Sequence, residues 1–214
     1  MPVTISGTDN FILNADTLGT AVAGAFDYDG KVFYATPQGT QRGVVPGAQF
    51  FRLDAGLAGA NVNTAQSVFG VGVTLSASTV YAFEAVYAFS KSAGTTAHTL
   101  GIGFGGTATL NNIGYQVNGS ESTSSFTARV NASTSELFVT SAANTTFSTS
   151  NATANVFVFG ALRGTVSVNA GGTFIPQYTL SAAPGGAYTT AAGSYFLIYP
   201  IGASGANVNV GTWA

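Results

Sequence analysis

Few side chains in this chain of 214 residues could catalyse a reaction, since it has one histidine, His98, and no cysteine. A Ser-His-Asp triad would need His98 as its base. His98 lies in an alternating apolar and polar stretch beside threonines, and the chain contains no Gly-x-Ser-x-Gly elbow, so we expect a half-exposed histidine on a strand. A transition-metal site needs several His or Cys ligands, so these counts argue against one.

Paired carboxylates are the next candidates, because two of them can hydrolyse a glycosidic bond. Asp27 and Asp29 are the closest pair in the sequence and would share one face of a strand. The dipeptide Asp29-Gly30 is typical of a tight hairpin turn, which explains Asp29 without catalysis. A calcium loop would need an acidic ligand where Lys31 stands. We therefore expect turn residues here and no metal ion.

Two other features have structural explanations of the same kind. Glu84 interrupts an apolar stretch, and we expect it to face outward or to pair with Arg163 or Lys91. The segment Gly101–Gly106 superficially matches a phosphate loop, but neither a Lys-Ser/Thr pair nor a helix pattern follows it, which favours a turn between strands. Together these observations predict a protein that is not an enzyme and binds no cofactor.

Charged residues are scarce: they make up 7% of the chain, whereas a typical soluble domain carries roughly 25%. Low charge indicates a surface that is buried against partners or kept wet by neutral hydroxyls and amides, and both suit a subunit of a larger assembly. The six basic residues are spread out and the net charge is −2, so we expect no nucleic-acid binding. The apolar stretches are too short to span a bilayer and Met1–Thr4 shows no signal-peptide pattern, so we expect no membrane insertion.

Strand patterns run through most of the chain, whereas helix patterns are nearly absent. Apolar residues alternate along Val80–Phe89 and along Val156–Val168, where we expect a bulge beside Gly160. Turn signals rich in Gly, Asn and Pro separate such runs. Roughly eight strands after residue 65 fit an all-β fold, a jelly-roll-like two-sheet sandwich.

The N-terminal part differs in composition, and we divide the chain accordingly. Residues 1–52 are expected to form an extended N-terminal arm or attachment segment, and residues 53–214 the β-sandwich domain. Within the arm, Phe26–Tyr34 predicts a small hairpin that turns at Asp29-Gly30. Such an arm, wrapped on a neighbour, would clamp adjacent subunits together.

Aromatic residues are the main candidates for binding. A tryptophan next to the carboxyl terminus would be wasted on a frayed tail, so we expect Trp213 to pack in the core or in a subunit interface. The predicted interface residues are Phe26, Tyr28, Phe33, Tyr34, Arg42 and Trp213. Alternatively, aromatic side chains would line a sugar-binding groove, with the candidates Tyr115, Tyr178, Tyr188 and Trp213.

Several segments share a style of sequence: Phe26–Tyr34, Thr40–Pro46, the stretch from Gly70–Leu75 to Gly105–Leu110, Gly171–Tyr178 and Gly193–Phe196. In these segments the chain resembles structural proteins of tailed bacteriophages, especially aquatic and cyanobacterial ones. The resemblance implies a trimeric virion component with a jelly-roll domain like those of capsid decoration proteins and fibre heads. It transfers no functional residue. The chain shows no repeat shaft, which favours a short decoration protein over a fibre.

We therefore expect a virion structural protein of a tailed phage, assembled in the host cytoplasm. The leading hypothesis is a homotrimeric decoration or cement protein on the head exterior, with the major capsid protein or another virion protein as its partner. The alternative is a tail-fibre or tail-tip subunit that binds a host-surface receptor or glycan. A polysaccharide depolymerase that uses Asp27 or Glu84 is the third alternative.

Overall fold

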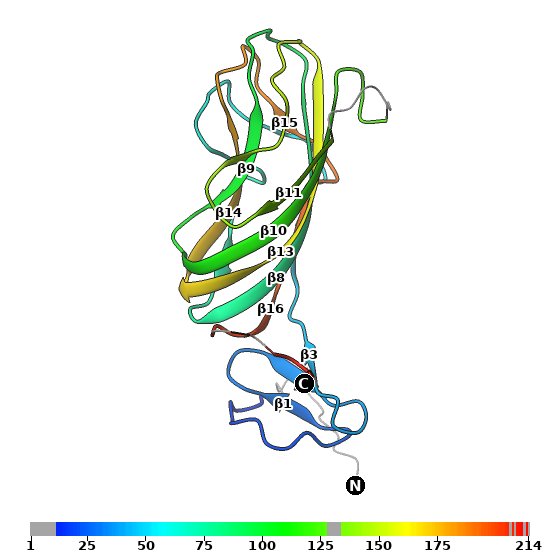
Figure 1. The fold of residues 1–214 in the computed structure, drawn as a ribbon, viewed down its shortest axis with the longest axis vertical. Helices are drawn as coiled ribbons and strands as arrows, with labels where there is room; N and C mark the ends of the chain where they lie inside the picture. The colour runs from blue at the N-terminus through cyan, green and yellow to red at the C-terminus, as the bar shows by residue number, and fades with distance from the viewer. Residues whose placement is uncertain (1–11, 128–133, 206, 208, 212, 214) are drawn as a thin grey trace.

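The computed structural model describes residues 12–127, 134–205, 207, 209–211 and 213, and every regular element in them is a β-strand. The strands form a small sheet at one end of an elongated molecule and two larger, packed sheets at the other (Figure 1). The predicted all-β sandwich is therefore confirmed. The start of the chain, for which we expect no signal peptide, lies outside the described residues.

The small sheet contains three antiparallel strands, β1 (Phe26–Tyr28), β2 (Phe33–Ala35) and β3 (Gly43–Val45). We call residues 26–45 the N-terminal sheet. β1 and β2 form the predicted hairpin, in which Gly30 has a φ of 87° that few other residue types adopt. β3 is an addition to that prediction. Val32, Tyr34 and Thr36, in and around β2, are buried, so this part of the expected arm is packed.

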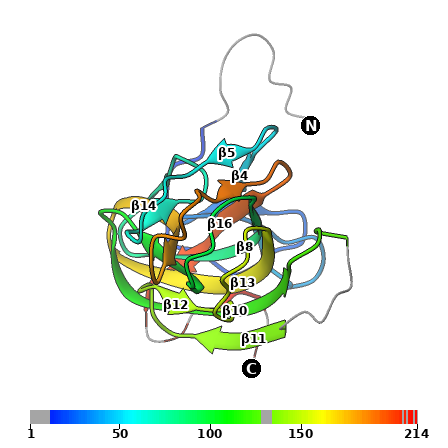
Figure 2. The same cartoon turned by 90° about the horizontal axis from the view of Figure 1, so that it is seen from above.

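The larger sheet of the sandwich is built around β8 (Thr79–Lys91), which pairs along its whole length with β13 (Val156–Ala170). Beyond β13 follow β10 (Thr109–Ser122) and β11 (Thr134–Val139). On the other edge of β8 lie β16 (Tyr195–Ala203) and β4 (Gln49–Arg52) in one half, and β15 (Thr189–Thr190) and β5 (Leu57–Ala58) in the other. Figure 2 shows β16, β8, β13, β10 and β11 in succession across this layer. β4 thus joins this sheet although its residues precede position 53.

The facing sheet has β14 (Gly172–Leu180) at its centre. One edge of β14 pairs with β9 (Leu100–Gly105), which in turn pairs with β12 (Thr145–Thr146). The other edge pairs with β7 (Val73–Leu75) and β6 (Gln66–Ser67) at different points. All these pairings are antiparallel. The jelly-roll order of connections stays a prediction.

The core between the two sheets is rich in aromatic side chains. Alternation along β8 turns one set of rings inward, as predicted: Tyr81, Phe83, Tyr87 and Phe89. The rings of Phe104 and Phe174 are stacked with centroids 4.6 Å apart, and Phe83 packs edge-on against Phe104. Each such ring stabilises the fold by about 1.5–3 kcal/mol when fully buried.

The predicted bulge beside Gly160 is wrong. β13 keeps an unbroken register with β8 and with β10 through this residue. Gly160 lies opposite Gly119, and this pair leaves room for the ring of Phe147, which a Cβ on Gly119 would approach to 2.6 Å. The irregular register in this sheet lies instead between Thr109 and Asn112 of β10 and between Pro200 and Gly202 of β16.

Candidate functional site

His98 is buried, at 2% exposure, so the expectation of a half-exposed histidine is wrong. Its Nδ1 lies 2.8 Å from the carbonyl oxygen of Thr96, and its Nε2 lies 2.8 Å from the hydroxyl of Tyr188. A carbonyl only accepts, so Nδ1 carries a proton, and in the neutral ring Nε2 then accepts from the tyrosine hydroxyl. Both ring nitrogens are thus engaged in holding the fold.

The two neighbouring carboxylates hold the N-terminal sheet together. Asp29 Oδ1 accepts two backbone N–H groups of the turn, at 2.8 and 2.9 Å, and Oδ2 accepts the hydroxyl of Tyr34 at 2.9 Å. Burial by itself would raise the pKa of Asp29, but these hydrogen bonds outweigh it and lower the pKa. Asp27 pairs with Arg42, with Oδ2 and Nη2 3.2 Å apart. The turn interpretation of Asp29-Gly30 is therefore confirmed.

Glu84 lies on the outer face of the large sheet and pairs with Arg163, its direct neighbour in β13, with Oε2 and Nε 3.5 Å apart. This is one of the two partners expected for it. The other, Lys91, is buried, and its three N–H donors are shared instead among four backbone carbonyl oxygens within hydrogen-bonding distance, at residues 93, 94, 153 and 154. Burial lowers the pKa of Lys91.

Metal-ligating groups are scattered in the structure. The described residues contain no group of three His, Cys, Asp or Glu side chains that could hold a metal ion. Glu121 is buried and accepts hydrogen bonds from Thr149 Oγ1 at 3.0 Å and from Asn151 Nδ2 at 2.6 Å. Its carboxylate therefore closes a loop of its own chain.

Three of the four aromatic residues expected to line a sugar-binding groove lie in the core. Tyr115, Tyr178 and Tyr188 are each almost completely buried, and burial raises the pKa of Tyr115 and of Tyr178 to about 12. An enclosed ring cannot stack on a sugar, so this prediction is wrong for all three. Trp213 is 79% exposed in the single chain and is not part of the core.

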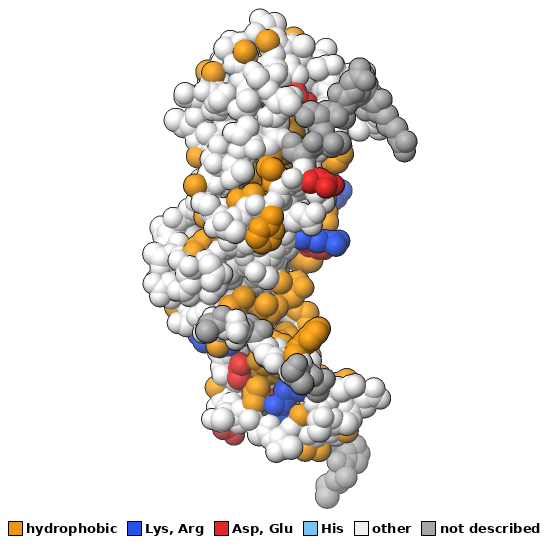
Figure 3. All heavy atoms as spheres, viewed as in Figure 1, with side chains coloured by type: hydrophobic (Ala, Val, Ile, Leu, Met, Phe, Trp, Pro, Cys, Tyr) orange, Lys and Arg blue, Asp and Glu red, His pale blue; other side chains and the backbone are white. Residues whose placement is uncertain are grey.

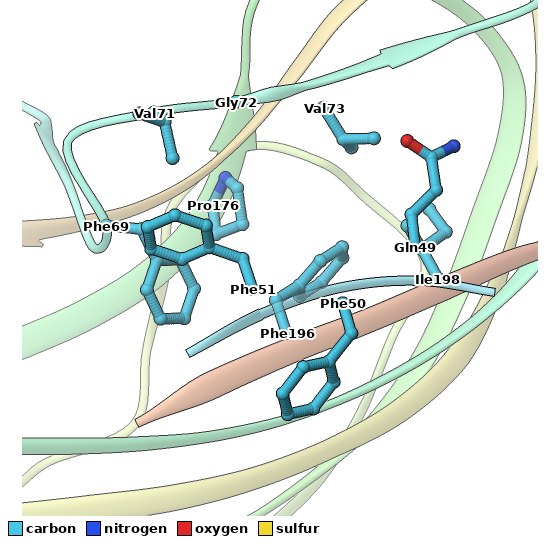
Figure 4. Close-up of a pocket in the computed structure, with 10 residues that line it drawn as sticks. All are labelled: Gln49, Phe50, Phe51, Phe69, Val71, Gly72, Val73, Pro176, Phe196 and Ile198. Atoms are coloured by element: carbon cyan, nitrogen blue, oxygen red, sulfur yellow. The ribbon is translucent and has the colours of Figure 1, made fainter. Parts of the chain in front are cut away.

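Among the hollows of the described surface, an apolar groove of about 200 Å³ has the lining best suited to an apolar ligand (Figure 4). Its walls come from β4 and β16 of the large sheet and from β14 and residues 69–73 opposite. Figure 4 shows Phe69 and Val71 at one end and Gln49 at the other. The Gln49 amide is the single polar side chain in the lining, so the groove suits an apolar group with one hydrogen-bonding atom.

An interruption in the facing sheet opens this groove. β7 pairs with β14 at residues 172–174 and β6 pairs with it at residues 177–178, so Pro176 falls in the gap. Proline has no N–H to donate toward β6 and β7, although its carbonyl oxygen accepts a hydrogen bond from the backbone N–H of Val68 at 2.9 Å. Gly72 lies so close to Ile175 that a Cβ would come within 2.6 Å of its Cγ1. The residue types at this point therefore separate β6 from β7 and leave a hollow.

Beside the groove, β4 forms a free edge of the large sheet, pairing only with β16 in the described part of the chain. Phe50 is 59% exposed and its ring stacks on Tyr195, with centroids 5.5 Å apart. Phe51 is 42% exposed and meets Phe69 edge-on at 5.6 Å. An exposed apolar edge strand is a template for pairing with another chain. The groove and this edge together form the candidate binding surface.

The predicted interface residues of the N-terminal sheet lie in two environments. Phe26 and Phe33 are exposed and stacked, with centroids 5.7 Å apart, and Tyr28 stacks on Phe33 at 4.7 Å. Tyr34 is buried, and Arg42 is engaged with Asp27 and with the carbonyl of a residue in its own chain. Phe26 and Phe33 are thus available to a partner, whereas Tyr34 and Arg42 stabilise their own sheet.

The groove residues are absent from the sequence-based interface prediction, although one signal points to them. Phe50 and Phe51 are adjacent in a strand, so their rings must face opposite sides and only one can point into a sandwich core. The sequence does not reveal that both rings remain exposed. That outcome depends on where β6 and β7 of the facing sheet end.

Charged groups are sparse on the molecular surface, and Figure 3 shows apolar side chains gathered in patches over one face. No helix in the described part of the chain has the length and apolar character to cross a membrane. Comparison with models of protein families, with curated proteins and with solved structures found no match to this chain.

Proposed function

We propose that this protein is a structural subunit that associates with copies of itself, in the particle of a tailed bacteriophage. The observation that carries the proposal is the free edge strand β4, whose two exposed phenylalanines lie beside the apolar groove. Left uncovered, such an edge invites uncontrolled pairing between chains. Association covers the edge and the groove, and the burial of this apolar surface stabilises the assembly.

The use of charge in the chain supports the same proposal. With 7% charged residues the surface lacks most of the repulsion that keeps monomers apart. Several ionisable groups are bonded within the chain: Asp29, Lys91, His98 and Glu121. Few ionisable side chains therefore remain available for catalysis, whereas association through apolar surface requires none.

The phage particle enters the proposal through the resemblance of the sequence to phage structural proteins. We propose the role of a homotrimeric decoration protein on the head exterior, attached to the major capsid protein or another virion protein. The N-terminal sheet supports attachment at that end, because it is a small separate sheet that exposes the stacked rings of Phe26 and Phe33.

Apolar contacts suit a particle that leaves the cytoplasm for salt water. The Debye length falls to about 3 Å at 1 M salt, so ion pairs on a surface lose most of their value there. Hydrophobic burial does not weaken in this way, and salts that are excluded from the surface strengthen it.

A second candidate function is a glycan-binding tail-fibre or tail-tip subunit. The exposed ring of Trp213 favours it, since a tryptophan face can stack on a sugar. Saturable binding of the purified protein to host polysaccharide, lost in Trp213→Ala, would support this role over that of a decoration protein.

Sedimentation velocity over a dilution series tests the association itself. We expect an oligomer at micromolar concentration, with a trimer as the expected stoichiometry. A compact monomer that stays monomeric there would overturn the proposal. Mass spectrometry of purified phage particles tests the second part, and absence of the chain from them would remove the phage role while leaving self-association intact.

A further inference from the structure

We propose that the apolar groove receives the side chain of Trp213 from a second copy of this chain. The inference rests on the proposed self-association and specifies the contact that carries it. Each copy would give one tryptophan and receive one, a head-to-tail arrangement that closes into a ring when the rotation between copies allows it.

The groove has the size and chemistry for one large aromatic side chain. Its volume of about 200 Å³ is smaller than the roughly 300–1,000 Å³ of pockets that hold drug-sized ligands. No charged residue lines it, and its rings and aliphatic groups suit the faces of an indole. The Gln49 side-chain oxygen can accept one hydrogen bond, which is what a buried indole N–H requires.

Trp213 has the matching properties. It is the single tryptophan of the chain and is 79% exposed. Its backbone carbonyl accepts a hydrogen bond from Asn209 Nδ2 at 3.2 Å, whereas no hydrogen bond of its indole N–H is found among the described residues. Tryptophan, like tyrosine and arginine, is enriched at the energetic centres of protein interfaces, and it combines a large apolar area with one hydrogen-bond donor.

The position of the tail favours a neighbouring copy over the same chain. Gly211, two residues before Trp213, lies next to the N-terminal sheet, since a Cβ there would be 3.6 Å from the carbonyl oxygen of Arg42, whereas the groove is lined by residues of the sandwich (Figure 4). A tail that extends past the N-terminal sheet can reach an adjacent molecule while its own groove is filled in the same way. The small net charge of −2 opposes such close approach only weakly.

A single tryptophan makes the contact measurable in the unmodified protein. Under selective tryptophan excitation, we expect the emission to shift to the blue as concentration rises, in step with the oligomer seen by sedimentation. An oligomer whose emission stays that of a solvent-exposed indole would overturn the inference and leave the proposed self-association standing. A blue-shifted emission at all dilutions, monomer included, would show that the tail fills its own groove and would also overturn it. A chain that never associates would overturn both.

Variants test the groove directly. Trp213→Ala should weaken association by about 30-fold or more. Val71→Gln places a polar group in the groove at a position that is 49% exposed, and association should weaken by about tenfold. The matched control is Val22→Gln, at a valine that is 61% exposed and away from the groove lining, which should leave association unchanged. Equal effects of the two valine variants would contradict the assignment.

The hydrogen bond between Gln49 and the indole gives a further test. Gln49→Leu and Trp213→Phe each remove one partner, and each should weaken association by about fivefold. The double variant should be no weaker than the single ones, because both remove the same bond. Additive losses would contradict this pairing. Circular dichroism and urea unfolding of every variant show whether the fold is kept.

Discussion

The Nε2 atom of His98 lies 2.8 Å from the hydroxyl oxygen of Tyr188, and both rings are buried. Burial and the nearby carboxylate of Glu121 raise the pKa of Tyr188 well above its ordinary value, so the hydroxyl stays protonated and is available to donate a hydrogen bond to Nε2 of the neutral histidine. The single histidine of the chain therefore connects the segment before β9 with the segment before β15. Its replacement should lower the stability of the fold.

Replacing His98 with leucine should destabilise the fold by about 2–3 kcal/mol, because the buried Tyr188 hydroxyl loses its hydrogen-bond partner and the Thr96 carbonyl loses its donor. Tyr188→Phe should cost about 1–2 kcal/mol, and the double variant less than the sum of the two. Urea unfolding measures all three. Tyr87→Phe is the matched control: its hydroxyl is buried without a hydrogen-bond partner among the described residues, so this variant should be neutral or more stable. A loss at position 87 equal to that at 188 would contradict the role of the hydrogen bond between His98 and Tyr188.

Lys91→Met should destabilise the protein by about 2–4 kcal/mol, since four carbonyl groups lose their shared donor in a buried place. The measurement is the free energy of unfolding in urea at neutral pH. Lys31→Met is the control: the Lys31 ammonium donates to a single exposed carbonyl, at Ala77, and its removal should cost less than about 0.5 kcal/mol. Comparable losses of stability in the two variants would show that the contacts of Lys91 with these four carbonyl groups do not stabilise the fold.

Asp29 should make the stability of the N-terminal sheet depend on acid. Its pKa in the folded chain is below the ordinary value of 3.8, so the folded state binds fewer protons there than the unfolded state. The stabilisation is present above that value and is lost as pH falls through the lower, folded pKa. NMR titration of the carboxyl carbon, with melting followed between about pH 5 and pH 2, measures both effects.

Asp29→Asn should remove that acid dependence, because the amide still accepts from the turn but cannot titrate. Asp54→Asn is the control at an exposed carboxylate and should retain it. An unchanged pH profile in Asp29→Asn would show that other groups cause the acid loss.

Alanine substitutions at two glycines with positive φ distinguish the cost of backbone strain from the cost of a steric clash. Gly106 has a φ of 114°, and a Cβ there would lie 2.2 Å from the carbonyl oxygen of Thr173, whereas Gly193 has a φ of 88° and open space around it. Gly193→Ala should cost about 1 kcal/mol from the backbone alone. Gly106→Ala should cost at least about 2 kcal/mol more, because the backbone of β14 must move. Thermal and urea unfolding measure the difference, and equal losses would mean that the strands separate freely at this point.

The sequence alone predicted the strand class, the hairpin at Asp29-Gly30 and the inward rings of β8, because these follow from local alternation and turn chemistry. It named Arg163 as one of two possible partners of Glu84, and the pairing of β8 with β13 decided between them. It did not predict the bonds of His98 and Lys91, which depend on residues up to 90 positions away in the chain. Only the tertiary structure decided that Tyr115, Tyr178 and Tyr188 are enclosed while Phe50 and Phe51 are exposed. The physical reason is that burial of a ring depends on which strands cover it, and the gap between β6 and β7 at Pro176 is a property of the assembled sheets.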